Sequence, residues 1–238
     1  MSGPAVSGDV EGYAARHQQF LTSTLPPLLA QVARPGVVVD LGCGDGALIW
    51  ALHHRARLGS LTYAVDLSQA RVDNAVQVAP GVTGIVADAA AVPLPDGVAD
   101  GVICSQVIEH VPEDRALARE IARLLKPGGW WYVGTVLRGS RAWWVYKVDG
   151  VRVLDPTHVR EYRAEEELWR VLDDPRLHVE VVTSSPMRYP ISDLLIRAVG
   201  RGRRVTGVYQ RVPEAARALK LRVPGYRLLE AAGTARPA

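Results

Sequence analysis

The chain has 238 residues, of which 48% are hydrophobic and 22% are charged, and its formal net charge is +3. This composition indicates a globular protein, and the length suits one α/β domain with an added subdomain but not two full-sized enzyme domains. Two cysteines exclude a disulfide framework and a zinc or iron–sulfur pattern, and neither a secretion signal nor an apolar run of about 20 residues is present, so we expect a cytoplasmic protein without a membrane span.

The first predicted element is a helix over residues 11–34, where apolar side chains recur at mostly helical spacing. Pro26 and Pro27 must bend or restart this helix, because proline lacks the amide proton that a helix interior needs. We expect residues 1–34 to form a cap across the edge of the sheet that follows. Arg16 is the preferred partner for an anion there, since a guanidinium binds a carboxylate with two hydrogen bonds.

A buried strand that runs into a glycine-rich turn comes next, with the sequence Val-Val-Val-Asp-Leu-Gly-Cys-Gly-Asp-Gly from residue 37 to residue 46. Gly42 and Gly44 allow backbone angles and a close approach that a Cβ atom would obstruct, so we expect a ligand to lie against this turn. The glycine spacing also fits a relaxed dinucleotide motif, but Asp40 and Asp45 would repel a diphosphate. A ligand with a cationic end suits the turn better.

Two more aspartates follow predicted strands. Asp66 lies 26 residues after Asp40, and Asp88 lies 22 residues after Asp66, which is about one helix plus one strand of a repeating βα unit. The carboxyl ends of such parallel strands share one edge of the sheet, and open α/β sheets bind ligands at that edge. One aspartate at a strand end often only caps the next helix, whereas three in register favour a binding site.

These segments resemble the class I S-adenosylmethionine-dependent methyltransferases that act on small molecules. Residues 99–111 are similar to the fourth strand of that family and its following loop, and residues 124–133 are similar to its next helix, Pro-Gly-Gly turn and fifth strand. The resemblance implies an α/β fold with a doubly wound, mostly parallel, seven-stranded Rossmann-like sheet, a C-terminal antiparallel strand, and helical or lid insertions. It also implies S-adenosyl-L-methionine as the cofactor and S-adenosyl-L-homocysteine as the product.

The same resemblance implies roles for individual side chains. Asp40 would lie near the ammonium group of the cofactor, Asp66 would bind both ribose hydroxyls, and Asp88 would meet the adenine amino group. The cofactor-binding residues that we predict are Arg16, Asp40, Gly42, Gly44, Asp66, Leu67, Asp88, Ala89, Ser105 and Gln106.

The predicted organisation has four parts, which are an N-terminal cap (1–34), a cofactor-binding core (35–137), an acceptor-site lid (138–163) and a segment that completes the sheet (164–238). Three aromatic residues in the lid favour an apolar acceptor pocket, although they would also suit lid packing or a dimer contact; they are Trp143, Trp144 and Tyr146. In the last part we expect a Pro- and Arg-rich insertion at 186–222, helical pieces at 192–199 and 213–221, and a final strand at 226–232.

Two histidines are candidates for catalysis. Methyl transfer depends mainly on holding the acceptor atom in line with the methyl group, but an alcohol or ammonium acceptor also needs a base with a pKa near neutrality. His110 follows the fourth strand and His158 lies in the lid, and either could instead make a structural hydrogen bond. Glu109 suits a helix-end or backbone partner better than a catalyst. We predict no metal site, because Asp149 and Asp155 alone do not define one.

The positive charge of the chain belongs to its last part. From Arg197 onward, nine arginines and one lysine face two glutamates, a net charge of +8. A basic segment can attract nucleic acid, but this one lacks interleaved aromatic residues and is better explained as a solvated face.

The predicted function is therefore O- or N-methylation of a small molecule in specialised metabolism. We expect the insertion at 186–222 to form a homodimer contact or to cover the acceptor. The alternatives are an RNA or protein methyltransferase and a cofactor-binding module without turnover.

Overall fold

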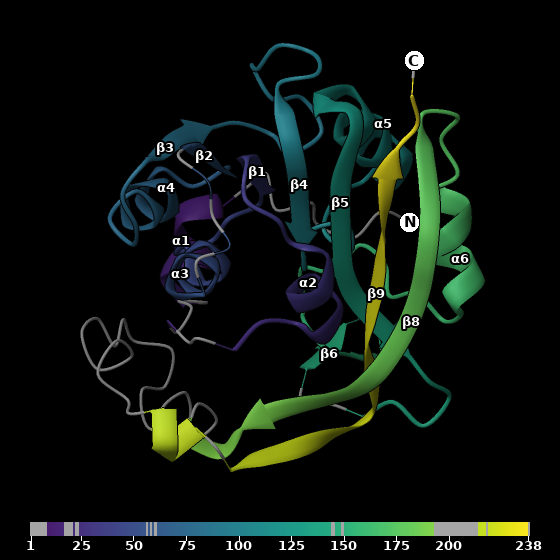
Figure 1. The fold of residues 1–238 in the computed structure, drawn as a ribbon. Helices are drawn as coiled ribbons and strands as arrows, with labels where there is room; N and C mark the ends of the chain where they lie inside the picture. Colours follow the sequence, from purple (N-terminus) through teal and green to yellow (C-terminus); the bar gives the residue numbers. More distant parts are fainter. Residues whose placement is uncertain are drawn as a thin grey trace.

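The computed structural model describes residues 9–16, 21, 24–55, 57, 59, 61–143, 146–148, 150–192, 214–217 and 219–237. Seven strands form one mixed sheet in the order β3-β2-β1-β4-β5-β9-β8, and β6 and β7 form a separate hairpin (Figure 1). The predicted α/β fold with a doubly wound, mostly parallel sheet is confirmed. None of the helices in the described part of the chain has the length and apolar character needed to cross a bilayer.

Five parallel strands form the larger part of the sheet, and they are β1 (Val37–Leu41), β2 (Leu61–Asp66), β3 (Val82–Val86), β4 (Ala99–Ser105) and β5 (Leu125–Arg138). The strand β9 (Lys220–Ala235) runs antiparallel between β5 and β8 (Leu177–Pro190). Gly101 shows how closely β4 and β5 pack. A Cβ atom at this position would lie 2.2 Å from the indole of Trp130, its partner on β5, so the position requires glycine.

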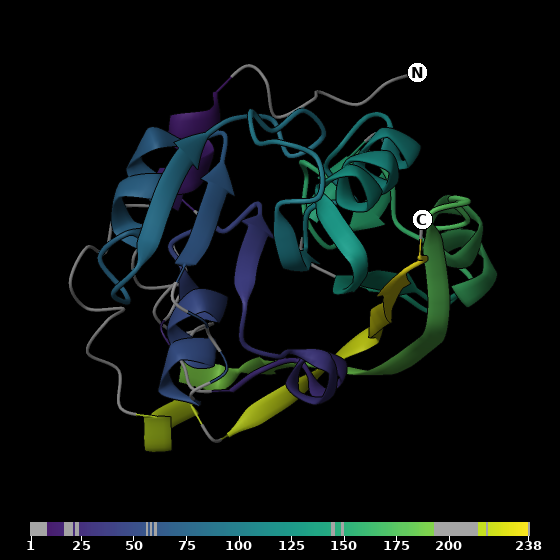
Figure 2. The same ribbon diagram turned by 45° about the horizontal axis from the view of Figure 1, so that its top comes forward.

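Helices cover both faces of the sheet, and they are α1 (Val10–Arg16), α2 (Pro27–Val32), α3 (Ala47–His54), α4 (Gln69–Ala75), α5 (Asp114–Leu124) and α6 (Glu165–Val171). One apolar cluster joins the sheet to α5 and α6, and a second joins its other face to α2 and α3. Figure 2 shows α2 and α3 on one side of the sheet and α5 on the other. Because successive side chains of a strand point to opposite faces, the apolar runs predicted as buried strands fill both clusters.

The N-terminal segment differs from the expectation of one helix over 11–34. Two short helices, α1 and α2, replace it, and Pro27 begins the second because proline is tolerated in the first turn of a helix. No side chain of its own caps α2. Instead, the buried carboxylate of Glu230 on β9 accepts hydrogen bonds from the amide of Leu28 (3.0 Å) and the hydroxyl of Tyr132 (3.2 Å). A strand from the other end of the chain therefore holds this helix in place.

The C-terminal part also differs from its prediction. β8 continues to Pro190, and β9 begins at Lys220 rather than at residue 226, so these strands pair beyond the end of β5. Of the two predicted helical pieces, most of the first (192–199) lies outside the described residues. The second (213–221) is replaced by one 3-10 turn at Glu214–Arg217 and the start of β9.

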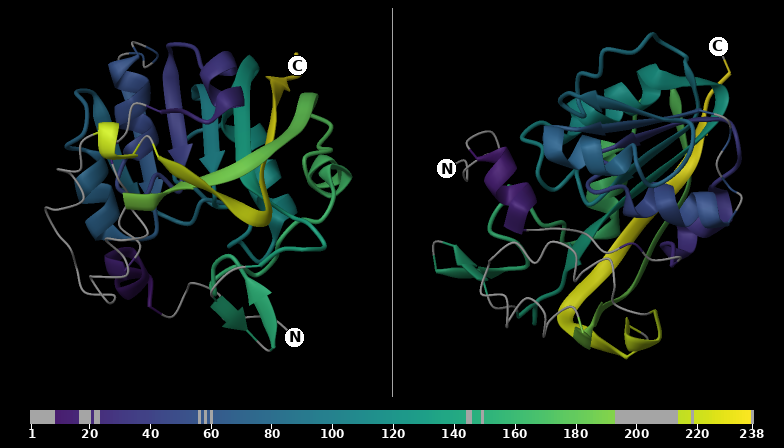
Figure 3. Two further views of the ribbon diagram at one scale, coloured as in Figure 1. Left: turned by 90° about the horizontal axis from the view of Figure 1, so that it is seen from below. Right: turned by 90° about the vertical axis from the view of Figure 1, so that its left-hand side faces the viewer.

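The predicted lid contains a small hairpin, formed by β6 (Tyr146–Val148) and β7 (Val151–Val153). Figure 3 shows this hairpin apart from the main sheet in two views. After it, the chain returns to the sheet, where Arg138 donates its backbone amide to Tyr162 (2.7 Å). Residues 154–162 are therefore held against the end of β5, whereas the hairpin projects from it.

Candidate functional site at the carboxyl edge of the sheet

Asp40 carries a buried carboxylate in the middle of the sheet. Its residue pairs with Ala64 on β2 and with Ile103 on β4, and only 2% of it is exposed. One carboxylate oxygen, Oδ2, has no hydrogen-bond partner among the described residues. Burial and the negative charge of Asp66 raise the pKa of Asp40 to about 8. A cationic group placed beside this carboxylate would therefore relieve an unfavourable burial.

Asp66 ends β2 and ties the glycine turn to the second strand. Its carboxylate accepts hydrogen bonds from the backbone amides of Gly44 (3.0 Å) and Ser68 (3.0 Å). The guanidinium of Arg71 lies 3.8 Å from the same carboxylate, and the hydroxyl of Ser68 accepts the amide of Arg71 to cap α4. Each oxygen of the Asp66 carboxylate accepts one backbone hydrogen bond and can accept another. Asp66 lies at the strand end where the resemblance places ribose hydroxyls.

The glycine turn requires its glycines for two reasons. Gly42 and Gly44 have φ angles of +69° and +54°, in the left-handed region that disfavours other residues. At Gly42, a Cβ atom would also lie 2.2 Å from Cγ2 of Val107. Val107 belongs to the loop after β4, so this loop is seated directly on the turn. The two predicted parts of the site, one after β1 and one after β4, are brought together here.

The third strand supplies a more exposed part of the edge. Asp88 follows β3 and is exposed, with Oδ1 accepting the amide of Ala90 (2.9 Å), while Ala89 is buried. Leu67 and Val86 are each 46% exposed at the ends of β2 and β3. A polar acceptor and two apolar side chains on neighbouring strand ends suit a flat, partly polar ring.

Ser105 and Gln106 change the direction of the chain after β4. Ser105 is the last residue of that strand, and Gln106 has a φ angle of +58° with its amide bonded to the carbonyl of Gly134 (2.7 Å). Residues other than glycine adopt this conformation uncommonly, and where they do, the surrounding structure must hold them. The turn leads directly to Val107 and, three residues later, to His110.

The helix α1 contacts both the end of β2 and the predicted lid. Glu11 accepts a hydrogen bond from the hydroxyl of Ser68 (2.9 Å), and Tyr13 donates to Asp155 of the lid segment (3.4 Å). The guanidinium of Arg71 lies over the ring of Tyr13, 5.2 Å from its centroid. Arg16 ends this helix, and its side chain lies outside the described part of the structure.

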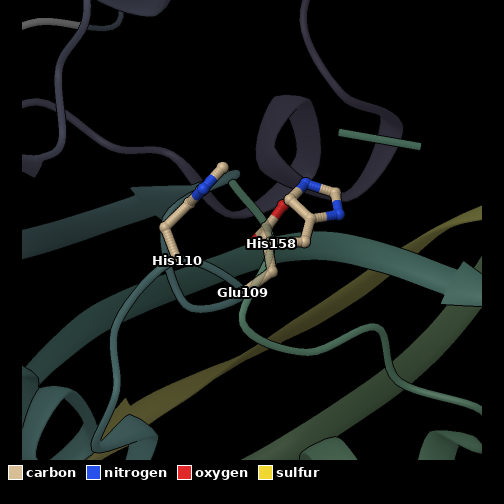
Figure 4. A group of neighbouring side chains, drawn as sticks. All are labelled: Glu109, His110 and His158. Carbon is tan, nitrogen blue, oxygen red and sulfur yellow. The ribbon is translucent and has the colours of Figure 1, made fainter. Parts of the chain in front are cut away.

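His110 and His158, which are 48 residues apart in sequence, are brought together. Their ring centroids lie 4.8 Å apart, and one ligand atom from each of Glu109, His110 and His158 lies within 4.8 Å of the others. Figure 4 shows the carboxylate of Glu109 beside the His158 ring, with His110 rising from the same loop. Glu109, expected as a helix-end or backbone partner, is fully buried, and its backbone carbonyl accepts the amides of Val159 and Arg160. Its Oε2 accepts from the hydroxyl of Thr135 (2.8 Å), and Oε1 has no partner among the described residues.

The two imidazoles have different environments. Burial lowers the pKa of His110, and the nearby charge of Glu109 offsets this only in part. Burial is also the largest single effect on His158 and opposes its protonation, but the hydrogen bond to Glu161 (3.1 Å) together with the nearby negative charges, including that of Glu109, outweighs burial, so the pKa of His158 is raised. The other oxygen of Glu161 accepts from the hydroxyl of Tyr226 (3.0 Å). Sequence reasoning missed Glu161 and Tyr226, although the spacing of three residues between His158 and Glu161 was a signal that could have found the first.

The aromatic residues of the predicted acceptor pocket lie on or beside the hairpin. Trp143 is 51% exposed, and the guanidinium of Arg152 lies over its ring, 5.0 Å from the centroid. Tyr146 is 39% exposed, and Trp144 lies outside the described residues. Trp143 and Tyr146 are therefore largely open to solvent, and the backbone amide of Trp143 is bonded to the carbonyl of Pro224 on β9 (3.2 Å).

Comparisons with known proteins agree with this geometry. Residues 39–133 match the family described as "Methyltransferase domain". A ubiquinone biosynthesis O-methyltransferase of Xanthomonas campestris pv. campestris is 39% identical over 122 residues, which are 48% of each chain, so the chain spans about half the length of the curated relatives it matches.

Two solved structures resemble the whole fold. The cyclase SpnF superposes with a TM-score of 0.65 at 18% identity, covering 100% of this chain and 98% of its own. The geranyl diphosphate C-methyltransferase of Streptomyces coelicolor, solved with S-adenosyl-L-homocysteine, has a TM-score of 0.57 at 20% identity and coverages of 87% and 75%. The family match at residues 39–133 covers the strands and loops whose sequence resembles the class I S-adenosylmethionine-dependent methyltransferases, and the two solved structures share the fold.

Proposed function

We propose that this protein transfers a methyl group from S-adenosyl-L-methionine to an oxygen or nitrogen atom of a small molecule. The observation that carries the proposal is the buried carboxylate of Asp40, whose Oδ2 has no hydrogen-bond partner among the described residues and which lies at the same edge as Asp66 and Asp88. A buried ion without a partner is unfavourable, and a ligand that carries positive charge but no phosphate compensates it. The residues present therefore fit this cofactor better than a dinucleotide.

Each predicted cofactor residue has a definite task in this proposal. Asp40 binds the ammonium group, Asp66 accepts the ribose hydroxyls, and Asp88 accepts the adenine amino group. The remaining contacts come from the two glycines of the turn, from Leu67 and Ala89 beside the adenine, from Ser105 and Gln106 after β4, and from Arg16 at the methionine carboxylate. When bound, the cofactor supplies an electrophilic methyl group on its sulfonium sulfur.

On the acceptor side, we assign His110 and His158 to the acceptor atom. His110 donates Nδ1–H toward the hydroxyl and carbonyl oxygens of Thr157, at 3.1 and 3.4 Å, which leaves Nε2 as an acceptor. Its lowered pKa keeps this ring neutral at pH 7, as proton removal from a hydroxyl requires. The O-methyltransferase name of the relatives favours oxygen, and we propose a phenol of specialised metabolism, because a phenol is acidic enough to need little further activation.

The test has two stages, because binding and turnover must be separated. Calorimetry with S-adenosyl-L-homocysteine should give one site per chain, and NAD should give none. A methyl-release assay over a panel of phenols, carboxylic acids and amines should then show turnover with at least one acceptor. Binding without turnover on every acceptor would support the alternative of a non-catalytic module. Binding of NAD with none of the nucleoside would overturn the cofactor assignment.

The basic C-terminal segment and the insertion lead to two further proposals. We propose that the segment is a solvated face, so RNA binding should be weak and should disappear at moderate salt. We also propose that the insertion at 186–222 supports a homodimer or covers the acceptor. Light scattering at several protein concentrations separates a dimer from a monomer, and tight salt-dependent RNA binding would favour an RNA acceptor instead.

A further inference from the structure

We propose that Glu109, His110 and His158 form a binding site for a divalent transition-metal ion. One ligand atom from each residue lies within 4.8 Å of the others. Around an ion with bonds of about 2.1 Å, ligand atoms are roughly 3 to 4 Å apart, so small side-chain rotations close the site. The sequence prediction of no metal site rested on the two cysteines and on Asp149 and Asp155, and it did not consider these three residues together.

The partners of the two imidazoles leave the same nitrogen available on each ring. The hydroxyl of Thr157 donates its proton to Asp155 (2.6 Å), so it serves as an acceptor for Nδ1–H of His110. Nδ1 of His158 is bonded to Glu161 (3.1 Å) in the same way. In each neutral ring the lone pair is then on Nε2, which makes no hydrogen bond within the described residues. Metal-binding histidines typically have their other nitrogen fixed by an oxygen acceptor of this kind.

Glu109 provides the negative charge of the site and the second, independent observation for it. Its side chain is completely buried, Oε2 is fixed by Thr135, and Oε1 has no partner among the described residues. The guanidinium of Arg160, a residue whose backbone amide reaches the carbonyl of Glu109, is bonded to the carbonyls of Ile108, Val111 and Pro112 and pairs with Asp114 (3.3 Å), and no ion pair joins Arg160 to Glu109 within the described residues. A buried carboxylate with one free oxygen is unfavourable unless a cation or a proton donor meets it.

The site is also held from outside. Backbone amides of Val159 (2.9 Å) and Arg160 (3.3 Å) are bonded to the carbonyl of Glu109, which joins the loop after β4 to the lid segment. Arg160 adds its guanidinium contacts to the same loop. The two chain segments that carry the three side chains are therefore fixed to each other, and the cluster does not depend on the exposed hairpin.

The chemistry of the three donors selects the ion. Two imidazole nitrogens and one carboxylate oxygen suit Zn²⁺, Co²⁺, Mn²⁺ or Fe²⁺, whereas Mg²⁺ and Ca²⁺ prefer oxygen ligands alone. Three protein ligands leave coordination positions open for water or for an oxygen atom of a ligand. With the ion bound, the two histidines would act on an acceptor hydroxyl through the metal instead of taking its proton directly. Metal binding itself can be measured without methyl transfer, because it requires neither the cofactor nor the acceptor.

The experiment uses the full chain, stripped of metal and without cofactor or acceptor. Titration with Co²⁺, followed by its visible absorption bands, should show one ion per chain with bands typical of nitrogen and oxygen ligands. Calorimetry with Zn²⁺ should give the same stoichiometry. X-ray absorption of the zinc-loaded protein should detect two imidazoles. No step of this test involves methyl transfer. A protein that binds the ion but has no methyltransferase activity would therefore support the metal site alone, and an active protein that binds no ion would support the proposed function alone.

Variants make the assignment specific. Glu109→Gln and His158→Ala should each weaken Co²⁺ binding by at least about tenfold, and Glu161→Gln, which only orients His158, by about 10- to 100-fold. His178→Ala, an exposed histidine of β8, is the matched control and should bind like the parent. Thermal unfolding followed by circular dichroism verifies that each variant is folded. Absence of Co²⁺ binding by the parent, or equal binding by folded Glu109→Gln, would overturn the proposal and favour a proton shared between Glu109 and His158.

Discussion

The edge formed by β1, β2 and β3 and the hairpin of β6 and β7 hold their side chains in different ways. Asp40 is 2% exposed and lies between hydrogen-bonded strands on both sides, so the sheet fixes where its carboxylate points. Trp143 and Tyr146, by contrast, are 51% and 39% exposed on or beside the hairpin. The difference indicates that the sheet fixes Asp40 before any ligand binds, whereas Trp143 and Tyr146 in the predicted lid retain conformational freedom.

The largest expected effect lies where the two regions meet. His158→Ala should lower kcat by at least about a hundredfold, the range typical for loss of an acid–base group, because the ring lies beside both His110 and Glu109. The affinity for S-adenosyl-L-homocysteine should change by less than about threefold. This limit corresponds to about half of the 1.4 kcal/mol that a tenfold change requires. Steady-state kinetics and calorimetry on one preparation check both values. A variant that lost affinity and kept kcat would assign His158 to the cofactor edge.

On the edge formed by β1, β2 and β3, Asp66→Ala should weaken S-adenosyl-L-homocysteine binding by about a hundredfold. Two hydrogen bonds to a charged acceptor contribute about 1.5 kcal/mol each, and about 2.8 kcal/mol corresponds to a hundredfold. Asp173→Ala, an exposed aspartate after α6, is the control and should bind normally. Unchanged affinity of a folded Asp66→Ala variant would remove the ribose assignment.

Asp40→Asn should have opposite effects on stability and on binding. The pKa of Asp40 is raised above its usual value to about 8, so the carboxyl form favours folding below pH 4 and this contribution is lost as the pH rises toward 8. The variant should therefore match the parent near pH 4 and exceed its free energy of unfolding by a few kcal/mol at pH 8.5, at roughly 1.4 kcal/mol per pH unit.

Urea unfolding at several pH values measures this difference, and calorimetry should show that the same variant has lost cofactor affinity. Ser105→Ala at the neighbouring strand end is a control for local packing in the unfolding measurement alone, because Ser105 is itself a proposed cofactor contact. A stability difference that does not vary with pH would show that Asp40 is not an isolated buried acid in the ligand-free protein.

The smallest expected effect on stability belongs to the hairpin. Trp143→Ala should change the free energy of unfolding by less than about 0.5 kcal/mol, because the side chain is half exposed. It should raise KM for the acceptor without altering cofactor affinity, if the hairpin closes over the acceptor. Equal acceptor KM values in the parent and the variant would assign the hairpin to another contact, and a large loss of stability would show that Trp143 packs more firmly than its exposure indicates.

The sequence predicted the regular half of the molecule well, for physical reasons. A buried parallel strand needs an unbroken apolar run, and the runs ending at Asp40 and Asp66 have one, so their strands and their common edge follow from local pattern alone. Asp88 lies just beyond its strand at the same edge. The antiparallel strand β9 was expected from the resemblance and is present between β5 and β8.

Features that depend on distant partners were not predictable in this way. The N-terminal helix is divided in two, and its second half is held by Glu230, which lies 202 residues away from Leu28 in sequence. The cluster of Glu109, His110 and His158 requires two loops to meet, and nothing in the local pattern of either loop encodes that contact. The role of Arg16 and the packing of Trp144 remain predictions, because those side chains lie outside the described residues.

The hydrogen bond from Leu28 to Glu230 has a consequence for synthesis of the protein. Leu28 leaves the ribosome long before Glu230, so the nascent helix α2 has no acceptor for its first amides until β9 has been made and inserted beside β5. We expect the early chain to expose an incompletely docked, apolar helix during translation, a state that chaperones recognise. Helix α2 would then pack fully against the sheet only after β9 has paired with β5.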